Sequence, residues 1–217
     1  MSEKQQFLFV RHGETVGNLE KIAHGQSESP LNDRGIRQAQ ITAAMLREWD
    51  TQYHRVYTSP LSRAHHTGQH IAEALGIPID THDDLVEGFL GDWEGGLFRH
   101  MLVDEHPAAL EFRRTHEWGV VPGAETNAQL IGRTSQALTG IHGRHSGEHI
   151  VCFVHGGVIA ALCAHTTGAP LTGFVGADNC SIHRLVLTEE RWFLRSFNDS
   201  THLDGVMTPQ AVIDTPA

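Results

Sequence analysis

Short runs rich in apolar residues at three places in the chain predict buried β-strands. They occupy residues 7–10, 55–58 and 149–154. A continuous apolar run of this length, bounded by turn-forming residues, is consistent with a strand covered on both faces. The pattern therefore favours a central sheet with other elements packed against both of its sides.

Helical periodicity appears in three segments between and beside these runs. In each segment, apolar residues recur three or four positions apart, which places them on one face of an α-helix. The three segments are residues 36–46, 61–75 and 130–141.

Capping residues punctuate two of these helices. Asn32 or Asp33 can cap the first helix. Ser59 as N-cap and Pro60 in the first helical position predict the start of the second, and Gly76 predicts its end.

A β-hairpin is predicted near the end of the chain, where SIHRLVLT and RWFLRSF flank Glu189 and Glu190. Strands that alternate with helices indicate an α/β fold with a parallel sheet. Because a hairpin adds antiparallel strands, we expect a three-layer αβα sandwich around a mostly parallel, mixed sheet.

The chain shows no internal repeat and no linker-like segment, so we expect a single domain over residues 1–217. Residues 81–125 have glycines, acids and aromatics without a clean period, which is typical of a lid or a substrate wall inserted between core elements. Residues 199–217 lack periodicity and are expected to form a loose tail.

Composition narrows the classes of partner. The chain has 16 Lys and Arg against 26 Asp and Glu, a formal net charge of −10. Such an acidic protein is a poor generic partner for nucleic acid or an anionic membrane, so we expect neither. A phosphorylated substrate would therefore need positive charge concentrated at one place.

Three widely spaced cysteines, Cys152, Cys163 and Cys180, indicate reduced buried thiols rather than a disulfide framework. The N-terminal stretch MSEKQQFLFV lacks the features of a signal peptide, and the most apolar stretch is too short to span a bilayer. These features predict a cytoplasmic protein.

The same local pattern occurs at two strand ends. Arg11, His12 and Gly13 follow one strand, while His155 and Gly156 follow another and precede a helix. Ligands of open α/β sheets bind beyond the carboxyl ends of the strands, and helix N-termini there attract anions. Two such ends side by side would place two imidazoles and a guanidinium around a small anion.

Arg63 adds a second guanidinium at a third strand end, in the first turn of the helix predicted after residues 55–58. A cation is disfavoured there by the helix dipole unless an anion lies nearby, and a phosphoryl group fits because guanidinium binds its oxygens bidentately.

The competing interpretation of these histidines is a metal site. Arg11 and Arg63 would repel a divalent cation, and neither His12 nor His155 has another ligand at the usual spacing, so we expect no metal.

With these residues in view, the chain resembles the histidine phosphatase superfamily and its phosphoglycerate mutase-like fold. The resemblance runs from Phe7 to Phe197 and rests on motifs in one order: FVRHGET, SPLNDRG, YTSPLSRAHHT, EGFLGDWEG, PGAET and FVHGGVI. It implies that His12 is the nucleophile and becomes a phosphohistidine, and that Glu87 is the general acid and base. The residues that it implies for binding the phosphoryl oxygens are Arg11, Arg63, His155 and Asn18.

For the general acid, the sequence offers alternatives to Glu87. Glu14, Asp92, Glu94 and Glu125 are rivals of Glu87, although Glu125 could instead cap the helix that follows it.

GDWEG and a compact 81–125 segment resemble the phosphatase branch, so we expect a phosphomonoesterase that acts on a small phosphorylated metabolite without a cofactor, as a monomer or homodimer. A mutase-type phosphotransferase and a phospho-ligand-binding protein without catalysis are the alternatives. Gly17 stands where many members of the family that the chain resembles have Trp, so the substrate pocket lacks that aromatic wall. Gly156, His24 and Gln26 are our candidates for binding the substrate.

Overall fold

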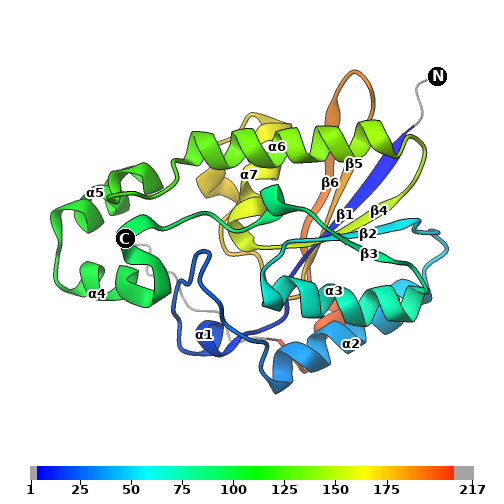
Figure 1. The fold of residues 1–217 in the computed structure, drawn as a ribbon, viewed down its shortest axis with the longest axis horizontal. Coiled ribbons are helices and arrows are strands. Elements are labelled where there is room, and N and C mark those ends of the chain that lie inside the picture. Colours follow the sequence, from blue (N-terminus) through cyan, green and yellow to red (C-terminus); the bar gives the residue numbers. More distant parts are fainter. Residues whose placement is uncertain (1–3, 208–217) are drawn as a thin grey trace.

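A six-stranded mixed sheet forms the centre of the molecule in the computed structural model, which describes residues 4–207 (Figure 1). Its strand order is β3-β2-β4-β1-β5-β6. The first four strands of this order are parallel, while β5 runs antiparallel to β1 and to β6. The strands are β1 (Gln5–Arg11), β2 (Arg55–Thr58), β3 (Ile79–Thr81), β4 (Ile150–Val154), β5 (Ile182–Leu187) and β6 (Trp192–Asp199).

Helices cover both faces of this sheet (Figure 1). They are α1 (Val16–Leu19), α2 (Asp33–Arg47), α3 (Ser62–Leu75), α4 (Leu97–Val103), α5 (Pro107–Thr115), α6 (Asn127–Arg144) and α7 (Gly156–Thr167). Short 3₁₀ turns lie at Asp83–Leu85, Gly91–Gly96, Trp118–Val120, Leu171–Phe174 and Thr201–Leu203.

The pleat of β1 explains the three layers. Phe7 and Phe9 point to the face that packs against α6 and α7, and Leu8 and Val10 point to the face that packs against α2 and α3. All four side chains are essentially excluded from solvent. Successive side chains of a strand alternate between faces, so an unbroken apolar run is what a sheet covered on both sides requires. The predicted αβα sandwich is confirmed.

The three predicted strands, the C-terminal hairpin and the three periodic helices are all present. Asn32 is the N-cap of α2 and accepts from the backbone N–H of Gly35, and Gly76 ends α3 in the left-handed region at φ 67°. The predicted start of α3 is wrong. Its N-cap is Leu61, without a side-chain cap, and the Ser59 hydroxyl instead hydrogen-bonds His155.

Within residues 81–125, α4 and α5 pack around a small apolar cluster of their own, which contains Trp93, Ala109 and Val121. The separate cluster explains why this segment shows no period that matches the main core. The expectation of a loose tail from residue 199 is wrong for the part that the structure describes: Leu203 is fully buried, and the side chain of Gln38 donates to the carbonyl of Val206. Residues 208–217 lie outside the described part of the chain.

The N-terminus of α2 lies against the loop that follows β1. A Cβ added to Gly13 would lie 2.5 Å from the carbonyl oxygen of Gly35, and a Cβ on Gly35 would lie 2.1 Å from that of Glu14. Both distances are far below van der Waals contact, so two glycines allow the two backbones to pack this closely. The position of the 12–14 loop therefore depends on Gly13 and Gly35.

Gly35→Ala should destabilise the protein by about 1–3 kcal/mol, because the added methyl group collides with rigid backbone rather than with a mobile side chain. Denaturant unfolding followed by circular dichroism measures this. Gly132→Ala on α6 is the matched control, since a Cβ there meets nothing within 4 Å. It should leave stability unchanged or raise it by about 0.5–1 kcal/mol. Equal effects of the two substitutions would contradict the close-approach argument.

Candidate active site

A cavity of about 810 Å³ lies beyond the carboxyl ends of β1, β2 and β4. The residues that we predicted for the site and that line it are Arg11, His12, Asn18, His24, Arg63, Glu87 and Gly156. The ring of His155 lies beside it, with its centroid 5.3 Å from that of His12. The structure thus brings together residues from both ends of the chain, at the place where α/β sheets bind ligands.

His12 has the geometry of a neutral nucleophile. The residue is buried, and its Nδ1 lies 2.8 Å from the carbonyl oxygen of Gly13. Because a carbonyl can only accept, this bond places the proton on Nδ1 and leaves the lone pair on Nε2. Burial and the charges of Arg11 and Arg63 hold the pKa of His12 well below its usual value. The imidazole is therefore neutral at pH 7, with its single proton on Nδ1.

Two guanidinium groups flank His12, and backbone carbonyls orient both. Arg63 is buried and donates through Nη1 to Ser27 O at 2.9 Å and through Nη2 to Gly25 O at 2.6 Å. Arg11 donates to the carbonyl of Ala177, and its Nε is buried without a hydrogen-bond partner among the described residues. A buried, unpaired donor beside a cavity is the arrangement expected of a group that binds an anionic ligand.

His155 is fully buried, and its Nε2 lies 2.7 Å from Ser59 Oγ. Its Nδ1 is also buried and has no partner among the described residues. Burial is the largest cause that lowers the pKa of His155, and the charge of Arg63 lowers it further. The ring is thus neutral, with one nitrogen fixed by the hydroxyl that we had expected to cap α3.

The carboxylate of Glu87 lines the cavity and lies against the N-terminus of α7. Its Oε2 accepts from the backbone N–H of Gly157 at 3.0 Å, and its Oε1 accepts from Gly88 N–H at 2.8 Å. A Cβ on Gly157 would lie 2.4 Å from Glu87 Oε1, whereas one on Gly156 would have only an ordinary contact with Arg11. Of the two glycines, Gly157 is therefore the one that the carboxylate position requires.

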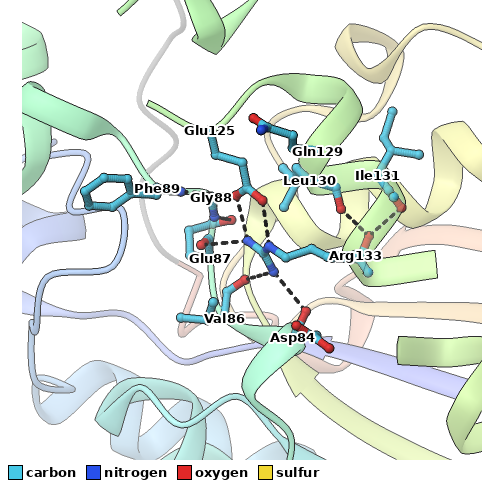
Figure 2. Close-up of polar contacts among 12 residues, drawn as sticks. Asp84, Val86, Glu87, Gly88, Phe89, Glu125, Gln129, Leu130, Ile131 and Arg133 are labelled. Carbon is cyan, nitrogen blue, oxygen red and sulfur yellow. Dashed lines mark hydrogen bonds and ion pairs between the residues drawn. The ribbon is translucent and has the colours of Figure 1, made fainter. Parts of the chain in front are cut away.

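Arg133 on α6 holds the segment that carries Glu87, and the sequence analysis missed it. Its guanidinium donates to the carbonyls of Asp84, Val86 and Glu87 at 2.8–3.0 Å (Figure 2). It also forms a two-pronged ion pair with Glu125, with N···O distances of 2.7 and 2.8 Å. A single half-buried side chain thus binds three carbonyls within four residues of the loop. An arginine on the polar side of an amphipathic helix gives no local signal of this role.

Each of the other candidate acids is either held by another group or absent from the cavity lining. Glu125 pairs with Arg133 and does not cap the following helix, whose N-cap is Thr126. Glu14 is buried in an ion pair with Arg34. Glu94 accepts from the backbone N–H groups of residues 26, 27 and 90, so it orders a loop. Asp92 is exposed and is absent from the cavity lining.

Asn18 is held by its own side-chain oxygen. Oδ1 accepts from Thr15 N–H and from Asn179 Nδ2, both at 3.1 Å. Asn179 in turn donates to the carbonyl of His12 at 3.0 Å, a link that the sequence did not reveal. With Oδ1 occupied, the amide of Asn18 offers its N–H groups to the cavity that it lines.

His24 occupies the space next to Gly17. A Cβ on Gly17 would lie 1.9 Å from His24 Nε2, so the two positions cannot both carry a full side chain. The imidazole of His24 thus lies where a side chain at position 17 would otherwise lie. Gln26, which we expected to touch the substrate, is absent from the cavity lining, and its side chain donates to the carbonyl of Glu87 at 2.9 Å. It supports the Glu87 loop.

Within residues 4–207, no group of three His, Cys, Asp or Glu side chains is arranged to hold a metal ion. In that same part of the chain, no helix combines the length and apolar character needed to cross a membrane.

Cys152, Cys163 and Cys180 are free and buried, and burial raises the pKa of the Cys163 and Cys180 thiols to about 12.

Comparison with known proteins gives one consistent family. Residues 7–200 match the model of the histidine phosphatase superfamily (branch 1). The chain is 32% identical over 208 residues to a metal-independent phosphoserine phosphatase of Arabidopsis thaliana, covering 94% of this chain and 86% of that protein. It is 31% identical over 199 residues to an uncharacterised phosphatase, PhoE, of Bacillus subtilis (strain 168), covering 90% and 95%. A mycobacterial glucosyl-3-phosphoglycerate phosphatase superposes with a TM-score of 0.78 at 26% identity, covering 91% of this chain and all of that one.

The buried neutral histidines predict how stability depends on pH. His12, His155 and His183 have depressed pKa values, about 3 for His183, chiefly because of burial. In the unfolded chain each would bind a proton near pH 6.5, while the folded protein does not, so the free energy of unfolding should fall as the pH drops below about 6.5. Each such group contributes a slope of up to about 1.4 kcal/mol per pH unit.

Urea unfolding at pH 7, 6 and 5 measures this slope. His183→Gln should reduce it by up to about 1.4 kcal/mol per pH unit. Substitution of the exposed His66, His66→Gln, should not change it. A slope that is the same in both variants would show that His183 is protonated in the folded state.

Proposed function

Because this chain belongs to the histidine phosphatase superfamily, we propose that it is a phosphomonoesterase that hydrolyses small phosphorylated metabolites through a phosphohistidine at His12. One observation carries the proposal: a buried imidazole, with its proton held on Nδ1 by Gly13 O, faces a cavity between two guanidinium groups. A neutral nucleophile surrounded by fixed cations suits phosphoryl transfer, which depends on positioning and on stabilising charge at the phosphoryl oxygens.

In the first step, Nε2 of His12 attacks phosphorus, and the bond from phosphorus to the ester oxygen breaks. Arg11, Arg63 and the N–H groups of Asn18 donate to the phosphoryl oxygens. His155 donates from its unpaired Nδ1, because the Ser59 hydroxyl can give its proton to Nε2. The nucleophile and its binding groups are already oriented, so little reorganisation is needed during the reaction.

Glu87 handles the protons. In its protonated form the carboxyl group donates to the leaving oxygen, and an alcohol is released. The resulting carboxylate takes a proton from the water that attacks the phosphohistidine. Inorganic phosphate leaves, and both His12 and Glu87 regain their starting forms. Gly157, Gln26 and Arg133 keep the carboxyl group in place.

We further propose that the protein is cytoplasmic and forms a single domain. Reduced, buried thiols fit a cytoplasmic protein. The segment 81–125 supplies the acid Glu87 and the cavity-lining residues Phe89 and Trp118, which supports its role as a substrate wall within a single domain. The two guanidinium groups, rather than a metal ion, neutralise the phosphoryl charge.

The phosphohistidine can be trapped directly. Brief incubation with ³²P-labelled substrate and quenching in base should leave label on the protein that is stable in base and released by acid. His12→Ala should trap none, because it removes the nucleophile. His165→Ala, which alters an exposed histidine on α7, should trap as much as the unsubstituted protein. Acid-stable label, or label on His12→Ala, would disprove the assignment.

Glu87→Gln separates proton donation from charge. In single-turnover experiments, phosphorylation of His12 by an alkyl phosphate should slow by about 10²–10⁴-fold, because an alkoxide leaves poorly without a proton. With nitrophenyl phosphate, whose phenolate leaves readily, the same step should slow much less. Asp92→Asn, an exposed carboxylate of the same segment, is the control and should affect neither substrate. Equal losses on both substrates would mean that Glu87 does not act as an acid.

A further inference from the structure

The outer part of the cavity differs in character from its inner end. The inner end holds the buried side chains of His12 and Arg63. The rim carries apolar side chains that remain exposed, with Phe89 at 41% and Val175 at 49% relative exposure. The larger apolar side chains that also line the cavity are Ile22, Leu90, Trp118, Leu130 and Leu171. Exposed apolar groups gathered at a cavity mouth indicate a surface that a ligand covers.

Most polar groups of the lining are already engaged within the protein. Glu125 is held by Arg133, and Asp178 accepts from the side chain of Asn198 at 2.9 Å. Ser29 accepts from the backbone N–H of Gly17. Thus the outer cavity has few free polar groups with which to recognise a charged organic group.

His24 and Lys21 are the exceptions. Lys21 is exposed. His24 is seated next to Gly17, and burial and the charge of Arg63 lower its pKa, so its ring is neutral at neutral pH. A neutral imidazole offers a flat wall with one donor or acceptor, and it does not attract a second anionic group as a cation would.

On this lining, and resting on the proposed phosphatase activity, we infer that the substrate is a phosphomonoester whose organic group is uncharged and largely apolar. The phosphoryl group occupies the cationic inner end. The organic group contacts Phe89, Trp118 and Val175 on one side and His24 on the other. A carboxylate or second phosphate at the far end of the substrate would lose its hydration against these apolar side chains without gaining a buried ion partner. A volume of about 810 Å³ falls in the ordinary range of small-molecule sites, about 300–1,000 Å³.

Two substrates with the same leaving group test this inference. Hexyl phosphate and 6-phosphohexanoate both release a primary alkoxide and differ only at the far end, where one has a methyl group and the other a carboxylate. Hexyl phosphate should show a kcat/KM at least about tenfold higher, because each is attacked identically and only one must desolvate a charge. Inhibition by vanadate, which probes the inner end alone, should be the same whichever substrate is used.

Val175→Lys should reverse the preference. An ammonium at the rim gives the carboxylate a partner and removes apolar contact, so kcat/KM should rise for 6-phosphohexanoate and fall for hexyl phosphate. Val103→Lys is the matched control, since Val103 is 74% exposed and does not line the cavity, and it should change neither value. Unchanged vanadate inhibition in both variants would show that the phosphate end is intact.

The outcomes separate this inference from the proposed function. If neither ester is hydrolysed and no phosphohistidine forms, the proposed function itself fails. If both esters are hydrolysed but 6-phosphohexanoate is equal or better, the phosphatase stands and the apolar substrate class is wrong. Loss of such a preference in Lys21→Met would then identify Lys21 as the group that binds a second anion.

Discussion

The enclosure of two guanidinium groups at the carboxyl ends of parallel strands is the constraint on which the site depends. Buried cations are costly unless hydrogen bonds and opposite charges surround them. Here the carbonyls of Gly25, Ser27 and Ala177 accept from Arg63 and Arg11. The loops that provide these carbonyls must therefore converge. Burial, and then the charges of the two arginines, suppress protonation of His12 and His155. An acidic chain thus contains one strongly cationic point.

The proposed acid is held from several directions at once. Glu87 receives a backbone N–H from the start of α7, its carbonyl is bound by Gln26, and Arg133 on α6 binds the same loop (Figure 2). None of these three groups needs to react. They convert an irregular segment into a rigid support, which matters because a general acid must lie within hydrogen-bond reach of the leaving oxygen. The residues most easily taken for alternative acids, Glu94 and Glu125, are part of this support.

A division of labour within the cavity follows from these arrangements. The inner end is polar, buried and determined by the sheet, whereas the outer wall comes largely from residues 81–125 and from the segment after α7. Loops on a rigid scaffold can vary without disturbing it. Recognition of the phosphoryl group and recognition of the organic group are thus carried by different parts of the chain. His24, which lies against Gly17, belongs to the part that recognises the organic group.

The sequence by itself determined the features that depend on neighbours along the chain. The apolar run into Arg11 and His12 predicts a buried strand that ends in the site, and the Asn32 cap and Gly76 terminus depend only on nearby backbone. The tertiary structure decided what distant segments do to each other. Ser59 meets His155 across 96 positions, Arg133 reaches the Glu87 carbonyl across 46, and Gly157 makes room for its carboxylate across 70. No local pattern encodes such contacts, because they exist only once the sheet has brought the strand ends together.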